Sequence, residues 1–81
     1  MDDRSIIEDI GDLVEEEKRL RARHEATEGL GDDDRARLQE VEERLDQCWD
    51  LLRQRRARRE SGLDPEDAEV RSQSTVEGYQ Q

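Results

Sequence analysis

Aromatic residues are almost absent from this sequence, which has no phenylalanine, one tryptophan and one tyrosine among 81 residues. The chain therefore lacks the interleaved aromatic side chains on which nucleic-acid bases stack. It also lacks any run of about eighteen apolar residues, which excludes a membrane-spanning helix. One cysteine cannot form an internal disulfide, and an unpaired thiol is typical of a reducing compartment. The acidic start, MDDRSII, lacks the basic and apolar regions of a secretory signal, so we expect a cytoplasmic protein.

Charge dominates the composition. Charged residues make up 47% of the chain and hydrophobic residues 30%, and the net charge is −10. Such a balance is typical of disordered chains. However, Ala, Glu, Lys, Leu and Arg together account for 40 of the 81 residues, a share that indicates long helices or coiled coils when the periodicity is right. The spacing of the apolar residues therefore decides between the two.

The first third of the chain carries apolar residues four and three positions apart, which is helical spacing. This spacing predicts a helix over about residues 6–28, begun by a capping box in which Ser5 and Glu8 each bond the other's backbone amide. Ile7 and Val14 widen the apolar stripe on one side. The predicted core positions of this helix are Ile6, Ile10, Leu13 and Leu20.

Glycines at positions 29 and 31 interrupt the pattern and predict a turn over residues 29–32, because glycine readily adopts the left-handed conformation at helix ends. A second helix is expected over about residues 33–61, capped by one of the aspartates at 32–34 and ended by Ser61, Gly62 and Pro65. Trp49 and Leu51 flank its apolar stripe. The predicted core positions of this helix are Leu38, Val41, Leu45, Cys48 and Leu52.

Charge blocks indicate how the two helices are arranged. Residues 1–17 hold eight acidic and one basic side chain, net −7, whereas residues 48–59 hold five basic and one acidic, net +4. Folding the chain at the glycines sets these blocks side by side, and a parallel arrangement would align like charges instead. The sequence thus predicts an all-α fold, an antiparallel two-helix hairpin similar to a coiled coil, over residues 1–62. In that register Glu17 lies near Arg44.

The hairpin alone is short of core, because it leaves Ile7, Val14, Trp49 and Leu51 largely in water. Pairing two hairpins would bury these flanks, so we expect a homodimer that forms a four-helix bundle. From position 63 the periodicity disappears and acidic residues prevail, which predicts a flexible acidic tail over residues 63–81.

A cluster of five arginines lies at positions 53, 55, 56, 58 and 59. Arginine grips phosphate well, but an isoelectric point near 4.5 disfavours nucleic acid as a partner. Matching of charge within the chain or with a partner protein is therefore the preferred interpretation. Binding of a nucleic acid or a phosphorylated ligand through this cluster is the alternative.

No pattern in the sequence indicates enzyme activity or metal binding. The acidic triplets at 15–17 and 32–34 do not match a calcium loop. His24 and Cys48 are too few for a transition-metal site, and in the expected hairpin they are too far apart for a catalytic pair. The chain also lacks a glycine-rich phosphate loop and a Ser-His-Asp set. We expect a protein without catalytic activity, cofactor or metal.

The residue types favour a non-enzymatic protein–protein interaction or oligomerisation module, because Trp and Arg often carry the energy of interfaces. The protein partner, other than a second copy, stays unidentified at this point. The predicted interaction surface consists of Trp49, Leu51, Arg53, Arg55, Arg56 and Arg59.

Three segments carry a resemblance to a known family: LVEEE at Leu13–Glu17, LDQCWDLLRQRRARR at Leu45–Arg59 and VEGY at Val76–Tyr79. With these segments the chain resembles, over nearly its whole length, the small actinobacterial family catalogued as domain of unknown function 2630. The resemblance implies a relationship and no activity, cofactor or site.

Overall fold

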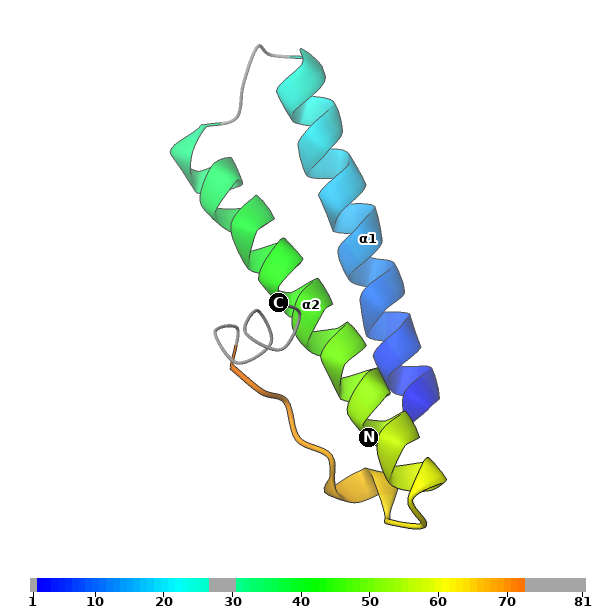
Figure 1. The fold of residues 1–81 in the computed structure, drawn as a ribbon. Helices are drawn as coiled ribbons and strands as arrows, with labels where there is room; N and C mark the ends of the chain where they lie inside the picture. Colours follow the sequence, from blue (N-terminus) through cyan, green and yellow to red (C-terminus); the bar gives the residue numbers. More distant parts are fainter. Residues whose placement is uncertain (1, 27–30, 73–81) are drawn as a thin grey trace.

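The computed structural model describes residues 2–26 and 31–72, which form two long helices and one short one. These are α1 (Asp3–Ala26), α2 (Asp32–Glu60) and the 3-10 helix η1 (Pro65–Asp67). α1 and α2 pack against each other and run in opposite directions (Figure 1). Because the described residues contain no strand, the prediction of an all-α fold with two packed helices is confirmed.

α1 begins earlier than the sequence predicts. The Asp2 carboxylate accepts a hydrogen bond from the Ser5 backbone amide at 2.8 Å, and the Asp2 carbonyl accepts one from the Ile6 amide at 3.2 Å. Asp2 is therefore the residue that caps the helix. The predicted capping box of Ser5 and Glu8 is wrong, because an aspartate three residues before Ser5 supplies the same bond one turn upstream.

α2 begins at Asp32, and its cap is the backbone of Gly31 (φ −63°, ψ 167°) without a side-chain cap bond. The prediction that an aspartate caps this helix is therefore wrong. Residues 32–34 instead occupy the first helical turn, where negative charge interacts favourably with the positive end of the helix dipole. Most of the predicted turn at 29–32 lies outside the described residues.

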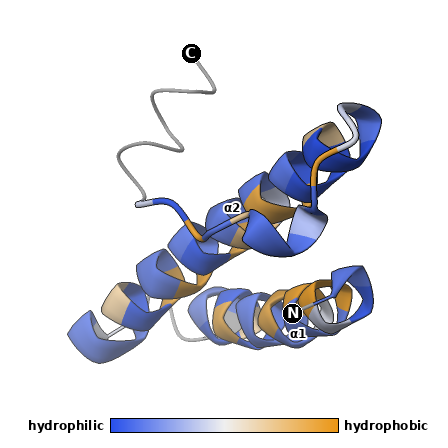
Figure 2. Ribbon diagram, turned by 90° about the horizontal axis from the view of Figure 1, so that it is seen from below, coloured by the Kyte–Doolittle hydropathy of each residue, from blue (hydrophilic) through white to orange (hydrophobic). Residues whose placement is uncertain are grey.

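The core lies between α1 and α2. Val41 is 0% and Ile6 is 1% exposed, and Figure 2 shows hydrophobic segments interspersed in two otherwise hydrophilic helices. The buried core consists of Ile6, Ile10, Leu20, Val41, Leu45 and Leu51. The remaining predicted core positions are half-buried against it: Leu13, Leu38, Cys48 and Leu52.

A glycine turn ends α2 and reverses the chain. Gly62 has a φ of 76°, in the left-handed region that glycine occupies without steric cost. Its amide donates to the Arg59 carbonyl at 3.2 Å and the Leu63 amide donates to the Arg58 carbonyl at 2.8 Å, the two bonds of a Schellman motif. Residues 63–72, the return segment, then run back beside α2 (Figure 1).

The return segment is attached to α2 by side chains. The Gln54 amide donates to the Glu69 carbonyl at 2.7 Å, and the Gln47 amide donates to the Arg71 carbonyl at 3.2 Å. Ala68 packs against the hydrophobic core. Residues 63–72 thus lie against α2, and the remainder of the predicted tail, residues 73–81, lies outside the described residues.

Leu51 was expected to be an exposed anchor and is instead a core residue, 6% exposed. Leu51 belongs to the hydrophobic cluster formed by both long helices, and Ala68 of the return segment packs against that cluster. Leu51 thus drops out of the predicted interaction surface.

Candidate functional site

A buried ion pair joins the return segment to α2. Asp50 is 0% exposed, and its carboxylate accepts hydrogen bonds from Arg71 Nε at 2.9 Å and Arg71 Nη2 at 2.5 Å. Gln54 donates a further bond at 3.0 Å. The Arg71 bonds favour the charged carboxylate and hold the pKa of Asp50 below its usual value. Asp50 is therefore an anion at neutral pH whose charge is fully matched.

Periodicity did not reveal this pair, but the charge blocks contain a signal for it. Asp50 is the one acidic residue within residues 48–59, and Arg71 is the one basic residue within residues 60–81. Residues 48–59 are otherwise basic and residues 60–81 are otherwise acidic. The single exception in each block has the charge needed to pair with the exception in the other block. That criterion would have selected both residues.

Arg55 was expected on the interaction surface, but it is buried, with 6% of the residue exposed. Its Nε donates to Asp3 Oδ1 at 2.5 Å, Nη2 donates to Glu66 Oε1 at 3.1 Å and Nη1 donates to the Pro65 carbonyl at 3.2 Å. Arg55 therefore joins α1, α2 and the return segment. The bond from Arg55, followed by that from Arg59, lowers the pKa of the Asp3 carboxyl.

The other arginines of the cluster fall into two groups. Arg56 pairs with Glu60 at 3.0 Å and Arg59 pairs with Asp3 at 2.9 Å. Within the described residues, Arg53 and Arg58 form neither an ion pair nor a side-chain hydrogen bond. These two guanidinium groups keep their full donor capacity.

A groove of about 410 Å³ runs between the two helices. It is lined by Asp9, Asp12, Leu13, Glu16, Arg37, Arg44 and Cys48. Arg37 donates two hydrogen bonds to the Glu16 carboxylate, and these bonds lower the pKa of Glu16. Burial raises the pKa of the Cys48 thiol, which keeps it protonated and unreactive. The lining of this groove therefore includes a salt bridge between the two helices and a cysteine that is not an activated nucleophile.

The predicted pair of Glu17 and Arg44 does not form. Glu17 lies 3.7 Å from Arg21 on its own helix, and Arg44 pairs with Glu40 at 3.0 Å. The neighbouring carboxylate, Glu16, makes the bond between the helices. The observed bond between the helices differs from the predicted one at both ends, because it joins Glu16 to Arg37.

The described residues contain no group of three or more His, Cys, Asp or Glu side chains that could hold a metal ion. His24 lies at a separate surface hollow of about 180 Å³, together with Arg21, Arg35 and Leu38. Among the residues that the structure describes, no helix is long and apolar enough to cross a membrane.

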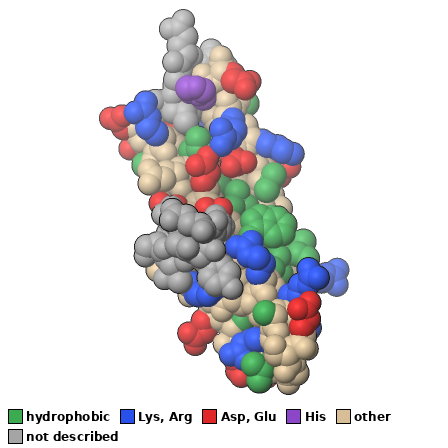
Figure 3. Space-filling model, viewed as in Figure 1, with side chains coloured by type: hydrophobic (Ala, Val, Ile, Leu, Met, Phe, Trp, Pro, Cys, Tyr) green, Lys and Arg blue, Asp and Glu red, His purple; other side chains and the backbone are tan. Residues whose placement is uncertain are grey.

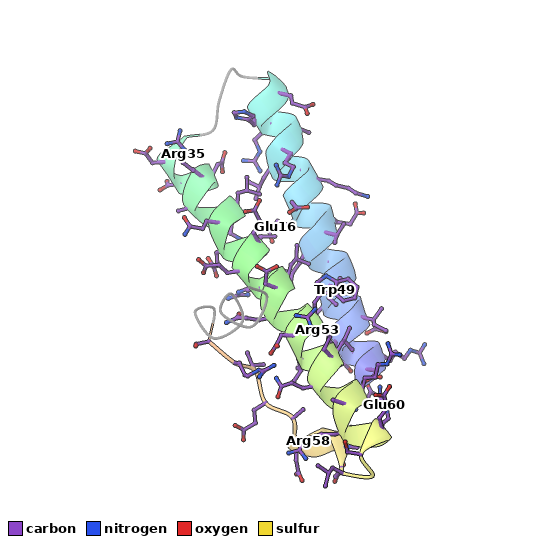
Figure 4. The ribbon with its side chains drawn as sticks, in the orientation of Figure 1. Glu16, Arg35, Trp49, Arg53, Arg58 and Glu60 are labelled. Carbon is purple, nitrogen blue, oxygen red and sulfur yellow. The ribbon has the colours of Figure 1, made fainter. Side chains whose placement is uncertain are left out.

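Apolar side chains remain exposed on one edge of the hairpin. Trp49 is 49% exposed and Ile7 is 57% exposed. Figure 3 shows hydrophobic side chains gathered at the middle of one face, and in Figure 4 Trp49 points from α2 toward α1. Of the predicted surface residues, the structure thus leaves Trp49 and Arg53 at the surface without a polar partner among the described residues, whereas Arg56 and Arg59 are engaged in ion pairs.

Acid is expected to destabilise the fold. The carboxyl pKa values of Asp3, Glu16 and Asp50 are lowered in the folded chain by hydrogen bonds from arginine. A carboxyl group with a lowered pKa contributes its full stabilisation when the pH is above the pKa that the group has in the unfolded chain. This contribution is lost as the pH falls through the pKa that the group has in the folded chain. We expect a melting temperature that does not fall between about pH 7 and pH 5 and declines below about pH 4. Far-UV circular dichroism measures it, and a midpoint still rising at about pH 3 would contradict the expectation.

Known proteins with similar sequences carry no assigned activity. The model of a family described as protein of unknown function (DUF2630) matches residues 2–81. Two uncharacterized proteins of Mycobacterium tuberculosis and one of Mycobacterium bovis are each 51% identical to this chain over 70 residues, which cover 86% of this chain and 80% of each relative. No solved structure matches the chain.

Proposed function

This chain belongs to the DUF2630 family of proteins of unknown function, and we propose that it is a non-enzymatic interaction module whose hairpin pairs with a second copy of itself. The observation that carries the proposal is the apolar edge, defined by Ile7, Val14 and Trp49. Ile7 and Trp49 are about half exposed although each is large and apolar, whereas Val14, which the sequence predicts to lie largely in water, is partly buried against the core. Large apolar side chains that gather at a surface often mark protein interfaces.

The three residues share one edge because of their spacing. Ile7, Val14 and Arg21 are seven residues apart on α1, and Glu42 and Trp49 are seven apart on α2. Residues seven apart lie on nearly the same side of a helix. Arg21 Nη2 bonds Glu42 Oε1 across the helices at 2.7 Å, which fixes this side of both helices as one edge. Two turns along, the same geometry sets Val14 opposite Trp49.

The shape of the hairpin leaves this edge uncovered. The shortest dimension of the molecule is 16 Å, little more than the diameter of one helix with its side chains, about 10 to 12 Å. A single layer of two helices cannot surround its apolar residues on all sides. The return segment meets Asp50 on α2 through Arg71, and Trp49 stays 49% exposed.

Gly11 supports the same edge as a contact surface. It lies between Ile7 and Val14, and a Cβ atom at this position would meet nothing within 4 Å. Glycine inside a helix costs about 1 kcal/mol relative to alanine, and nothing within the hairpin requires it. A glycine on an outer edge lets a second helix approach closely.

Charge complementarity favours a second copy as the occupant. Residues 1–17 carry net −7 and residues 48–59 carry net +4. In a two-fold dimer the same patch meets itself in opposite orientation, so α1 of one protomer lies against α2 of the partner. Each acidic block then faces a basic block, and the contact has the arrangement of a four-helix bundle.

Replacing Trp49 by alanine is expected to weaken self-association by about tenfold or more, because buried Trp residues are frequent interface hot spots. Sedimentation equilibrium measures the dissociation constant against a protomer mass of 9.5 kDa. Val70→Ala is the matched control, since Val70 is 61% exposed on the return segment. In the Ile7→Ala variant, Trp49 remains as a fluorescent probe. As the protein concentration rises, its emission maximum should shift to shorter wavelength by less than in the wild type.

Two results would reject the dimer. One is a wild-type mass that stays at 9.5 kDa up to the highest soluble concentration. The other is a dimer whose dissociation constant is unchanged by both Trp49→Ala and Ile7→Ala, since the apolar edge would then lie outside the contact.

A further inference from the structure

A second groove lies on the outer side of α2, at the return segment. It has a volume of about 320 Å³ and opens over the small side chain of Ala57. Its lining consists of Arg53, Gln54, Ala57, Arg58 and Arg71. Three of these five side chains are guanidinium groups, and none is a carboxylate. Figure 4 shows Arg53 and Arg58 on the part of α2 that the return segment passes.

The electrostatic state of the lining distinguishes it from the rest of the arginine cluster. Arg55, Arg56 and Arg59 donate to carboxylates of the chain itself. Arg53 and Arg58 form no such pair within the described residues. The chain as a whole has a net charge of −10, but this groove contains two arginines that form no ion pair with a carboxylate. We therefore expect a locally positive electrostatic potential in the groove, which attracts small anions.

Asp50 and Gln54 hold the third guanidinium group in place. The Asp50 carboxylate is fully buried and takes two bonds from Arg71, while Gln54 donates to both Asp50 and the Glu69 carbonyl. The orientation of Arg71 is therefore fixed before any ligand arrives.

We propose that this groove binds a small phosphate-bearing molecule, with Arg53 and Arg58 as the donors to its phosphate group and Arg71 in the groove wall. Planar guanidinium forks match the oxygens of phosphate, and the volume is at the lower end of the range for small-molecule sites, about 300 to 1,000 Å³. A nucleic acid is disfavoured because its other phosphates would meet the acidic surface of the chain. Arg53 and Arg58 come from α2 and Arg71 from the return segment, so the groove lies where the two segments meet.

Titration with inorganic phosphate and pyrophosphate tests the site, with sodium chloride at equal ionic strength as the reference. The reference is needed because salt alone stabilises a highly charged chain by screening its self-repulsion. We expect saturable shifts of the backbone amide resonances of residues 53–58 and a melting temperature above that in sodium chloride.

Arg53→Gln and Arg58→Gln should each weaken phosphate binding by about tenfold, the effect of losing one charge-assisted bond. Arg56→Gln is the matched control, because Arg56 is exposed and paired with Glu60 outside the groove. It should change the affinity by less than about twofold. Repeating the titration in Trp49→Ala separates this site from self-association, and the affinity should be unchanged there.

Three outcomes would overturn the proposal. Resonance shifts that grow without saturation and equal those in sodium chloride indicate screening alone. An equal loss of affinity in Arg56→Gln and Arg53→Gln indicates a diffuse field and no site. A short single-stranded oligonucleotide that binds more tightly than pyrophosphate, with an affinity that falls steeply with salt, would assign the groove to nucleic acid.

Discussion

Replacing Arg71 by methionine is expected to lower the free energy of unfolding by about 2 to 3 kcal/mol. The change leaves the Asp50 carboxylate, which is 0% exposed, without the guanidinium group that matches its charge. Loss of one partner from a buried ion pair usually costs about 3 to 5 kcal/mol. The lower value is expected here because the Arg71 side chain is itself 32% exposed, so water can solvate part of the vacated site.

Urea unfolding followed by circular dichroism measures the change, and two further variants interpret it. Arg56→Met removes an exposed pair with Glu60 one helical turn away and should have little effect. Asp50→Leu combined with Arg71→Met removes both charges and should recover much of the loss, since apolar residues can replace a buried ion pair. If Arg71→Met is no more harmful than Arg56→Met, the buried pair does not stabilise the fold.

Ile6→Ala is expected to lower the free energy of unfolding by about 3 kcal/mol. Ile6 is 1% exposed and lies in the core between α1 and α2. Removing its outer carbons deletes buried apolar surface and leaves a cavity, because helices that are packed elsewhere along their length close it only partly.

Ile7→Ala provides a matched control within the same turn of the same helix. The residue type and the helix propensity change are identical, but Ile7 is 57% exposed. Its replacement should change the stability of the separated protomer by no more than about 0.5 kcal/mol and should weaken self-association instead. Equal losses for the two variants at low protein concentration would show that the face of α1 that meets α2 has been assigned wrongly.

The two helices and most of their contact could be predicted from the sequence, because a seam of apolar residues with 3.6-residue periodicity is a local property of each helix. Ile6, Ile10, Leu20, Val41 and Leu45 occupy such a seam and are buried. Contact with one partner helix that carries a matching apolar seam is enough to bury these residues, and no other segment is needed.

The surroundings of Leu51, Asp50 and Arg55 could not be predicted in the same way. Asp50 and Arg55 are charged, and their partners Arg71, Glu66 and the Pro65 carbonyl lie in the return segment. Residues 63–72 contain one short helix and otherwise irregular backbone, and such a segment has no periodic pattern to reveal which side it covers. Side-chain bonds from Gln47 and Gln54 position it, and glutamines in a charged helix are indistinguishable from ordinary solvent-facing residues.

The long separation between Asp50 and Arg71 has a consequence for biosynthesis. The counter-charge of Asp50 is supplied 21 residues later in the chain, so translation must pass position 71 before the second helix can bury that carboxylate without penalty. A polypeptide terminated or cleaved just after Gly62 carries the Asp50 carboxylate without its Arg71 partner. We expect quality-control proteases to remove such shortened products faster than the full-length chain, and pulse-chase comparison of the two lengths would measure the difference in lifetime.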